Sequence, residues 1–154
     1  MTEREYEPIR KVIDVSLSQE EAFTLFTDRM KEWWPLESHS VFNDRSREII
    51  FQAWEGGKLI ESGPNDETSV WGTVSVADRP NRLVFSWHPG RDPETAQEVE
   101  VRFTKAETGC RVELEHRGWE RYGEAAAKSY EGYVSGWDYV FVQRFGGKNV
   151  SVGA

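Results

Sequence analysis

The stretch that decides the fold is residues 124–145, EAAAKSYEGYVSGWDYVFVQRF. Its apolar positions recur every three or four residues, which is the spacing of one face of a helix; they are Ala126, Tyr130, Tyr133, Val134, Trp137, Val140, Phe141 and Phe145. This spacing predicts an amphipathic helix of about six turns, which ends at Gly146-Gly147. Gly132 and Gly136 lie inside it at a cost of about 1 kcal/mol each, and we interpret them as places of close packing between helix and sheet.

Upstream of this helix the apolar residues alternate, which is the pattern of strands buried on one face. The predicted strands are residues 9–15, 48–54, 58–62, 69–77, 82–88, 97–105 and 111–117. Turn residues separate them, and Gly56-Gly57 is a hairpin turn of this kind. We expect two short helices after the first strand, one capped by Ser16 or Ser18 and one near residues 29–34 that ends before Pro35.

Strands followed by a long helix indicate an α+β fold with an antiparallel sheet of about six to seven strands. We expect this sheet to curve around the C-terminal helix. One helix cannot fill the concave side of so large a sheet, so a cavity is expected beside it. Residues 36–47 have mixed polarity and no clear period, and we expect them to form a loop at the mouth of this cavity.

Length and composition exclude several classes of protein. The 154 residues suit a single domain, with a core expected over about residues 8–146. The only cysteine is Cys110, which excludes an intrachain disulfide. The polar N-terminus, MTEREYEPIR, lacks the apolar segment of a signal peptide, and no apolar run approaches the roughly 20 residues of a membrane span, so the expected location is the cytoplasm. A net charge of -8 disfavours nucleic acid as a partner.

Short motifs in order along the chain resemble one known superfamily. They are residues 13–23, Glu32-Trp33-Trp34-Pro35, Gly56-Gly57, Gly72-Thr73-Val74, Arg82-Leu83-Val84-Phe85, residues 114–119 and Gly136-Trp137. Together they are similar to the SRPBCC (START-like, helix-grip) superfamily, and within it to the branch named after the activator of the heat-shock-protein-90 ATPase. The resemblance implies a sheet that grips the C-terminal helix, in a superfamily of lipid carriers, hormone binders, cyclases, dehydratases and co-chaperone domains. Residues 138–141, DYVF, replace the leucines that often follow the Gly-Trp pair, which predicts a differently shaped pocket.

Seven tryptophans suit a cavity that binds apolar rings, because indoles offer large apolar faces. By strand parity and helix face, we predict a cavity lined by Trp33, Trp34, Phe51, Trp71, Phe85, Trp87, His116, Trp137 and Phe141. Trp33 and Trp34 should lie near its mouth. The leading hypothesis is the binding of an apolar or aromatic small molecule, with no cofactor.

His116 is the best single candidate for catalysis, because strand parity places it on the inner face of its strand. An inward histidine can transfer a proton. The alternative hypothesis is therefore a cyclase, dehydratase or hydrolase that uses His116 as acid or base. His39, in the expected mouth loop, could contact a ligand, although a surface position is the simpler interpretation. His88 falls on the opposite face of its strand from Trp87.

Metal binding, nucleophilic catalysis and chaperone activation have less support in the sequence. The histidines are too far apart for a metal-binding motif and Cys110 is alone, so no metal is expected, and the cysteine is interpreted as a structural thiol. Because no nucleophile motif is present, binding ranks above catalysis. A third hypothesis, implied by the resemblance, is a module that activates a chaperone ATPase; it ranks last. A weak homodimer is expected because dimers are common.

Overall fold

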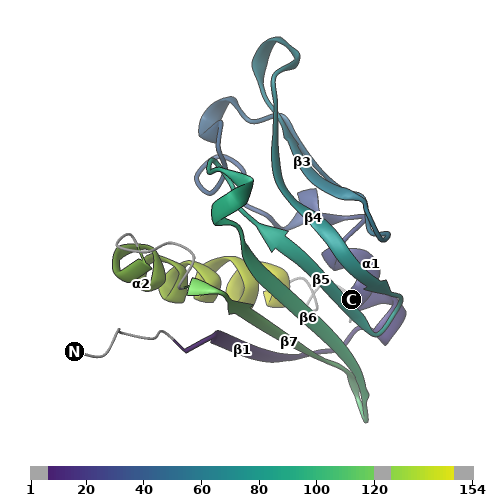
Figure 1. Cartoon of the computed structure of the whole chain (residues 1–154). Helices are drawn as coiled ribbons and strands as arrows, with labels where there is room; N and C mark the ends of the chain where they lie inside the picture. Colours follow the sequence, from purple (N-terminus) through teal and green to yellow (C-terminus); the bar gives the residue numbers. More distant parts are fainter. Residues whose placement is uncertain (1–6, 120–125, 148–154) are drawn as a thin grey trace, which may run out of the picture.

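The computed structural model describes residues 7–119 and 126–147. Within these ranges, seven strands form an antiparallel sheet in the order β1-β7-β6-β5-β4-β3-β2, which is strongly curved (Figure 1). The strands are β1 (Ile9–Val15), β2 (Glu48–Phe51), β3 (Lys58–Ser62), β4 (Thr68–Asp78), β5 (Arg82–Trp87), β6 (Gln97–Ala106) and β7 (Gly109–Arg117). Strands β2 to β7 pair in chain order, and β1 pairs with β7. The predicted α+β fold is confirmed.

The first helix, α1 (Gln19–Phe26), starts at a capping box. The Ser18 hydroxyl accepts a hydrogen bond from the Glu21 backbone N–H, and the Glu21 carboxylate accepts one from the Ser18 backbone N–H. Of the two serines expected to cap this helix, Ser18 does so. The second short helix is a single 3-10 turn, η1 (Met30–Glu32), which is shorter than the predicted helix near residues 29–34. Further 3-10 turns are η2 (Asn43–Arg45), η3 (Pro64–Asp66) and η4 (Pro93–Thr95).

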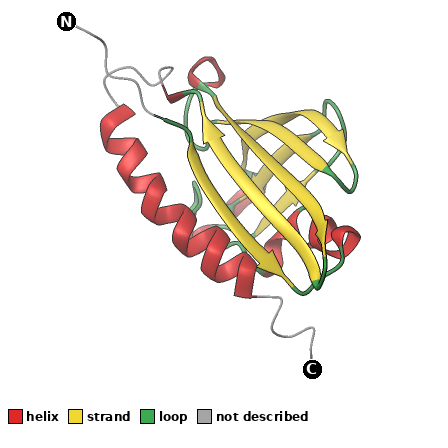
Figure 2. Ribbon diagram, turned by 90° about the horizontal axis from the view of Figure 1, so that it is seen from below, coloured by secondary structure: helices red, strands yellow, loops and turns green. Residues whose placement is uncertain are grey.

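The long C-terminal helix lies across one face of the sheet (Figure 2). It consists of α2 (Ala126–Trp137) and, directly after it, the π-helix η6 (Asp138–Phe145). The π-helix η6 ends at Phe145, but Gly146 and Gly147, which were predicted to end the helix, are themselves helical; the predicted first residues, 124 and 125, lie outside the described residues. Among the described residues, no helix combines the length and apolarity that a membrane span requires.

An aromatic core fills the space between η6 and the sheet. The ring of Phe26, in α1, lies between 5.2 and 6.5 Å, centroid to centroid, from the rings of Trp33, Phe51, Phe103, Phe141 and Phe145. Arg144 ties the helix to this core, because its Nε–H donates to the Trp33 carbonyl at 2.9 Å. The helix α1 and the turn η1 therefore close this end of the structure.

Strand β4 departs from simple alternation. Its pairing register with β5 shifts between Val74 and Val76. At Gly72 the strand approaches β5 so closely that a Cβ atom would stand 1.7 Å from the Ser86 carbonyl oxygen. Consecutive residues Trp71 and Gly72 are both buried, so the direction of a β4 side chain cannot be deduced from alternation alone.

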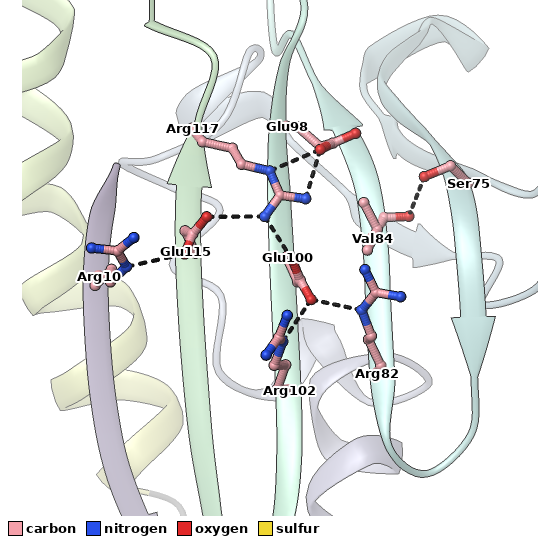
Figure 3. A network of polar contacts seen from close by, with 9 residues as sticks. All are labelled: Arg10, Ser75, Arg82, Val84, Glu98, Glu100, Arg102, Glu115 and Arg117. Carbon is pink, nitrogen blue, oxygen red and sulfur yellow. Dashed lines mark hydrogen bonds and ion pairs between the residues drawn. The ribbon is translucent and has the colours of Figure 1, made fainter. Parts of the chain in front are cut away.

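The outer face of the sheet carries a network of ion pairs (Figure 3). Its centre is Glu100 on β6, whose side chain is only 6% exposed. This carboxylate accepts hydrogen bonds from Arg82 at 2.6 Å, from Arg102 at 2.7 Å and from Arg117 at 2.6 Å. Burial alone would raise the pKa of Glu100, but these three hydrogen bonds outweigh it and lower the pKa from 4.5 to about 2.

We expect Glu100→Gln to lower the free energy of unfolding by roughly 2 kcal/mol at neutral pH. The pKa shift corresponds to about 3 kcal/mol, and the value is reduced because the arginines remain accessible to water. A carboxyl group whose pKa is lowered by folding stabilises the protein above its unfolded pKa, and that stabilisation disappears as the pH falls from 4.5 toward about 2. Urea unfolding at neutral pH and near pH 3 measures this. The exposed Glu113→Gln is the control, and an equal loss at both pH values would contradict the prediction.

Candidate functional site

A pocket of about 730 Å³ opens beside α2. This volume falls within the roughly 300–1,000 Å³ of ordinary ligand sites. Its walls come from the segment after η1, from β4 and β5, from the loop after β5 and from the C-terminal helix. The lining residues are Trp34, Ser38, His39, Ser40, Val41, Trp71, Trp87, Pro89, Gly90, Arg91, Gly132, Tyr133, Gly136, Trp137 and Val140.

Four tryptophans form the inner wall of the pocket. The ring centroid of Trp34 lies 5.2 Å from that of Trp71, 5.9 Å from that of Trp87 and 5.9 Å from that of Trp137. The rings of Trp87 and Trp137 are 5.5 Å apart. Each of the four side chains is at most 6% exposed. The four rings come from different elements, so this wall depends on the tertiary fold.

Every indole N–H of this wall is hydrogen-bonded inside the protein. The four bonds are Trp34 Nε1 to the His39 carbonyl at 2.6 Å, Trp71 Nε1 to Glu61 Oε1 at 3.0 Å, Trp87 Nε1 to Tyr133 Oη at 3.0 Å and Trp137 Nε1 to His116 Nδ1 at 3.0 Å. These bonds fix the orientation of the rings. The wall therefore offers no free indole donor to the pocket.

A buried carboxylate holds the mouth loop against this wall. Glu61, on β3, has no exposed surface. Besides the Trp71 indole, it accepts the backbone N–H groups of Val41 at 2.8 Å and Phe42 at 3.0 Å. The mouth predicted at residues 36–47 thus contributes four residues of the pocket lining, from Ser38 to Val41.

His39 links the mouth loop to the C-terminal helix. Its ring centroid lies 5.3 Å from that of Tyr139, and its Nδ1 is 2.7 Å from the Ser38 hydroxyl. His39 lines the pocket, so the structure places it on the pocket side of this loop and not simply on the outer surface.

The loop after β5 forms the opposite rim, with Pro89, Gly90 and Arg91. The buried His88 anchors it: the Arg91 backbone N–H donates to the His88 carbonyl at 2.9 Å, and His88 Nδ1 lies 3.2 Å from the Arg91 carbonyl. Gly90 has a φ of 69°, a left-handed conformation that suits glycine. The rim is therefore an ordered turn that carries Arg91 to the pocket.

The two helix glycines face the pocket, which corrects their interpretation as close packing sites. A Cβ atom built at Gly132 or at Gly136 would meet no atom of the described structure within 4 Å. With Val140, four residues further on, they form a strip along one side of the helix that lines the pocket. The helix therefore exposes flat backbone there, and the open space belongs to the cavity.

Tyr133 is one of the residues that line the pocket. Its Oη accepts the Trp87 indole N–H, and its ring lies 4.9 Å from that of His116. Burial raises the pKa of Tyr133, against smaller lowering effects of the Trp87 hydrogen bond and the Arg91 charge. The phenol is accordingly held in its protonated form.

His116, the predicted acid or base, lies behind the wall and does not line the pocket. It has no exposed surface. An indole can only donate, so His116 Nδ1 accepts from Trp137, and His116 Nε2–H donates to Gln97 Oε1 at 2.5 Å. Burial lowers the pKa of His116 to about 3. With both nitrogens engaged and the ring neutral, this histidine positions Trp137 and is not placed to exchange a proton with a ligand.

The nine residues predicted to line the cavity separate into two groups. Trp34, Trp71, Trp87 and Trp137 line the pocket. The other five are buried in the packed interior: Trp33, Phe51, Phe85, His116 and Phe141. Sequence reasoning did not select Arg91, Tyr133 or the two glycines. Tyr133 was on the predicted apolar face of the helix, one turn before Trp137, and this spacing was the available signal.

The described residues give no support for metal or thiol chemistry. Across residues 7–119 and 126–147, no group of three His, Cys, Asp or Glu side chains is arranged to hold a metal ion. Cys110 is buried, and this burial raises the pKa of its thiol. Its environment favours the neutral thiol over the reactive thiolate.

The whole fold is similar to solved structures. Protein MLL2253 from Mesorhizobium loti matches with a TM-score of 0.69 and 14% identity, over 96% of this chain and 98% of that chain. Protein SA2116 from Staphylococcus aureus matches with a TM-score of 0.62 and 17% identity, over 96% and 98%. The anthrahydroquino-gamma-pyrone synthase Txn09 matches with a TM-score of 0.65 and 29% identity, over 95% of this chain and 99% of that chain.

A search of curated proteins gives no match. The family model described as "Activator of Hsp90 ATPase homolog 1-like protein" matches residues 16–145. The match begins just after β1 and ends with η6, so it includes every element that lines the pocket. This chain therefore belongs to the activator of Hsp90 ATPase homolog 1-like family, a branch of the SRPBCC superfamily.

Proposed function

We propose that this protein binds a planar aromatic small molecule in the tryptophan-lined pocket. The observation that carries the proposal is the state of the four indoles of the wall: each N–H is bonded inside the protein, so the wall offers aromatic carbon and no free indole donor to a ligand. Aromatic carbon favours flat apolar partners through burial and offset or edge-to-face stacking. The cavity volume of about 730 Å³ has room for several fused rings.

The glycine strip leaves room for a ligand along the helix. Gly132 and Gly136 each carry a helix-propensity cost of about 1 kcal/mol relative to alanine, and no packing contact at their Cβ positions accounts for them. Side chains there would project into the pocket. Their absence leaves this side of the pocket open to a ligand.

Ring closure on such a ligand is a second candidate function. Txn09, which is 29% identical over 95% of this chain, is an anthrahydroquino-gamma-pyrone synthase. Its name denotes a product in which a pyrone ring is joined to an aromatic ring system, and a pocket that binds fused rings suits such chemistry. To test this, the protein would be incubated with the substrate of Txn09, with Txn09 as the positive control, and product would be followed by chromatography. Binding of that substrate without turnover would rule out this ring-closing reaction.

Gly136→Leu is expected to weaken ligand binding about tenfold or more without destabilising the fold. The new side chain fills part of the pocket, while the helix gains up to about 1 kcal/mol of propensity. The measurements are quenching of tryptophan fluorescence by a dihydroxyanthraquinone and thermal unfolding.

Gly147→Leu is the matched control, because it adds the same side chain at an exposed glycine of the helix end, where a Cβ also meets no atom. It should leave the affinity unchanged. If Gly136→Leu binds the dye as tightly as the wild type, the pocket is not the binding site.

A further inference from the structure

We infer that His39 is the proton acceptor of the pocket, and that the aromatic ligand carries an ionisable hydroxyl group which gives its proton to His39 Nε2. This inference rests on the proposed function and adds a substrate class and a reacting residue to it. His39 lies in the mouth loop between η1 and η2, where it lines the pocket and is half-buried.

Of the described side chains that line the pocket, His39 is the one suited to take up a proton. None of these lining residues is Asp, Glu, Lys or Cys. The guanidinium of Arg91 stays charged and accepts no proton. Burial raises the pKa of Tyr133, so this phenol keeps its own proton. The hydroxyl groups of Ser38 and Ser40 are weak bases, whereas a neutral imidazole can take up and release a proton near neutral pH.

The other two histidines of the chain have structural positions. His116 lies behind the tryptophan wall with both ring nitrogens hydrogen-bonded. His88 is buried, and its Nδ1 lies 3.2 Å from the Arg91 carbonyl in the turn of the rim. Neither of them lines the pocket, so His39 is the histidine that a bound ligand can contact.

The backbone of His39 is held in place by two hydrogen bonds. Its N–H donates to the Pro35 carbonyl at 2.9 Å, and its carbonyl accepts the Trp34 indole N–H at 2.6 Å. Because Trp34 belongs to the tryptophan wall, the second bond fixes the histidine directly beside the rings that are proposed to contact the ligand. The position of His39 is therefore set before a ligand binds.

Two side-chain contacts orient the imidazole of His39 and leave one of its nitrogens available. Nδ1 lies 2.7 Å from the Ser38 hydroxyl, and the ring centroid lies 5.3 Å from that of Tyr139. A hydroxyl oxygen can accept a hydrogen bond, so Ser38 can accept Nδ1–H both before and after the ring is protonated. Across residues 7–119 and 126–147, Nε2 of His39 has no hydrogen-bond partner. Nε2 is therefore the atom that can accept the proton of a ligand.

The proton transfer leaves a phenolate beside an imidazolium. The O–H bond of the ligand breaks, its electron pair stays on the oxygen, and the proton forms a new N–H bond at Nε2 of His39. In ring closure, the second candidate function, this oxygen would add to a carbonyl carbon of the same ligand. The π electrons of the carbonyl move to its oxygen, which takes the proton back from Nε2. The addition is then balanced without an oxidant or a co-reactant.

The titration of a coloured phenol bound in the pocket tests this proton transfer. The probe is 2-hydroxyanthraquinone, whose visible absorption changes when its hydroxyl group ionises, and 2-methoxyanthraquinone is the matched probe that cannot ionise. An imidazolium favours a neighbouring phenolate, so binding should lower the apparent pKa of the dye by about one unit. His39→Gln can still form a hydrogen bond to the hydroxyl group but cannot take its proton. This variant should therefore bind both dyes as the wild type does and lose the shift.

The control variant is Arg45→Gln, an exposed change in the same loop outside the pocket lining, which should keep the full shift. Glu37 in this loop, Arg91 on the opposite rim and Asp138 on η6 are common to all three proteins, so the difference between wild type and His39→Gln reports His39. A shift of equal size in these two proteins, or wild-type binding without a shift, would overturn the inference and leave ring binding intact. If neither anthraquinone quenches the tryptophan fluorescence of the wild type, the proposed function itself fails.

Discussion

Glu61→Gln is expected to lower the free energy of unfolding by about 3 kcal/mol, because it removes a buried acceptor that three donors share. The carboxylate accepts Val41 N–H and the Trp71 indole on Oε1 and Phe42 N–H on Oε2. A glutamine in the same position can accept on one oxygen only. Its amide group would face a further N–H donor in a site with no exposed surface, and one backbone donor of the mouth loop would lose its partner.

Urea unfolding gives the size of this effect, and native-state amide hydrogen exchange gives its location. Exchange should become faster at Val41 and Phe42, and dihydroxyanthraquinone affinity should fall because the mouth loop lines the pocket. Glu67→Gln, an exposed change in the same β3–β4 hairpin, should stay within about 0.5 kcal/mol of the wild type. Unchanged protection of the Val41 and Phe42 amides in Glu61→Gln would show that the carboxylate does not hold the loop.

The periodic elements of this fold are predictable because periodicity is a local property. Spacings of three and four residues locate the C-terminal helix as far as Phe145, and alternation locates the strands. The change of the helix to π geometry at Asp138 leaves no comparable pattern in the sequence.

The division of the aromatic residues between core and pocket could not be predicted in the same way. Trp33 and Trp34 are neighbours after a 3-10 turn, where neither helix nor strand period applies. Trp33 points into the Phe26 and Phe145 core, and Trp34 joins the pocket wall. Which ring faces the cavity depends on where α1 fills the interior, and this is a long-range property.

The roles of the two helix glycines and of Glu61 could be predicted only in part from the sequence. Gly132 and Gly136 have the same sequence signature whether they allow close packing or leave open space, and only the empty surroundings of their Cβ positions decide between the two. Glu61 shares the inner face of β3 with the buried Leu59, so strand parity alone could have identified an inward carboxylate. Its three donors come from distant parts of the chain and could not be identified from β3.

His116 should make the protein progressively less stable as the pH falls below 6.5. The folded state holds this imidazole neutral, because burial lowers its pKa from 6.5 to about 3. The unfolded chain therefore binds a proton that the folded chain does not. A group whose pKa is lowered by folding stabilises the protein above its unfolded pKa and loses that stabilisation as the pH decreases, here by about 2 kcal/mol at pH 5.

His116→Gln separates this effect from other acid titrations. Glutamine does not titrate, yet its amide can accept from the Trp137 indole and donate toward Gln97 Oε1, as the histidine does. In urea unfolding between pH 7 and pH 5, the variant should lose most of the pH dependence of the free energy of unfolding. Glu100→Gln should retain it, since the Glu100 carboxyl affects stability only below about pH 4.5. A full wild-type slope in His116→Gln would assign the acid sensitivity to another group. A protonated His116 can no longer accept the Trp137 N–H. Protonation therefore opposes the position that the Trp137 indole takes in the pocket wall. Stability in acid and the shape of the pocket thus depend on the same hydrogen bond.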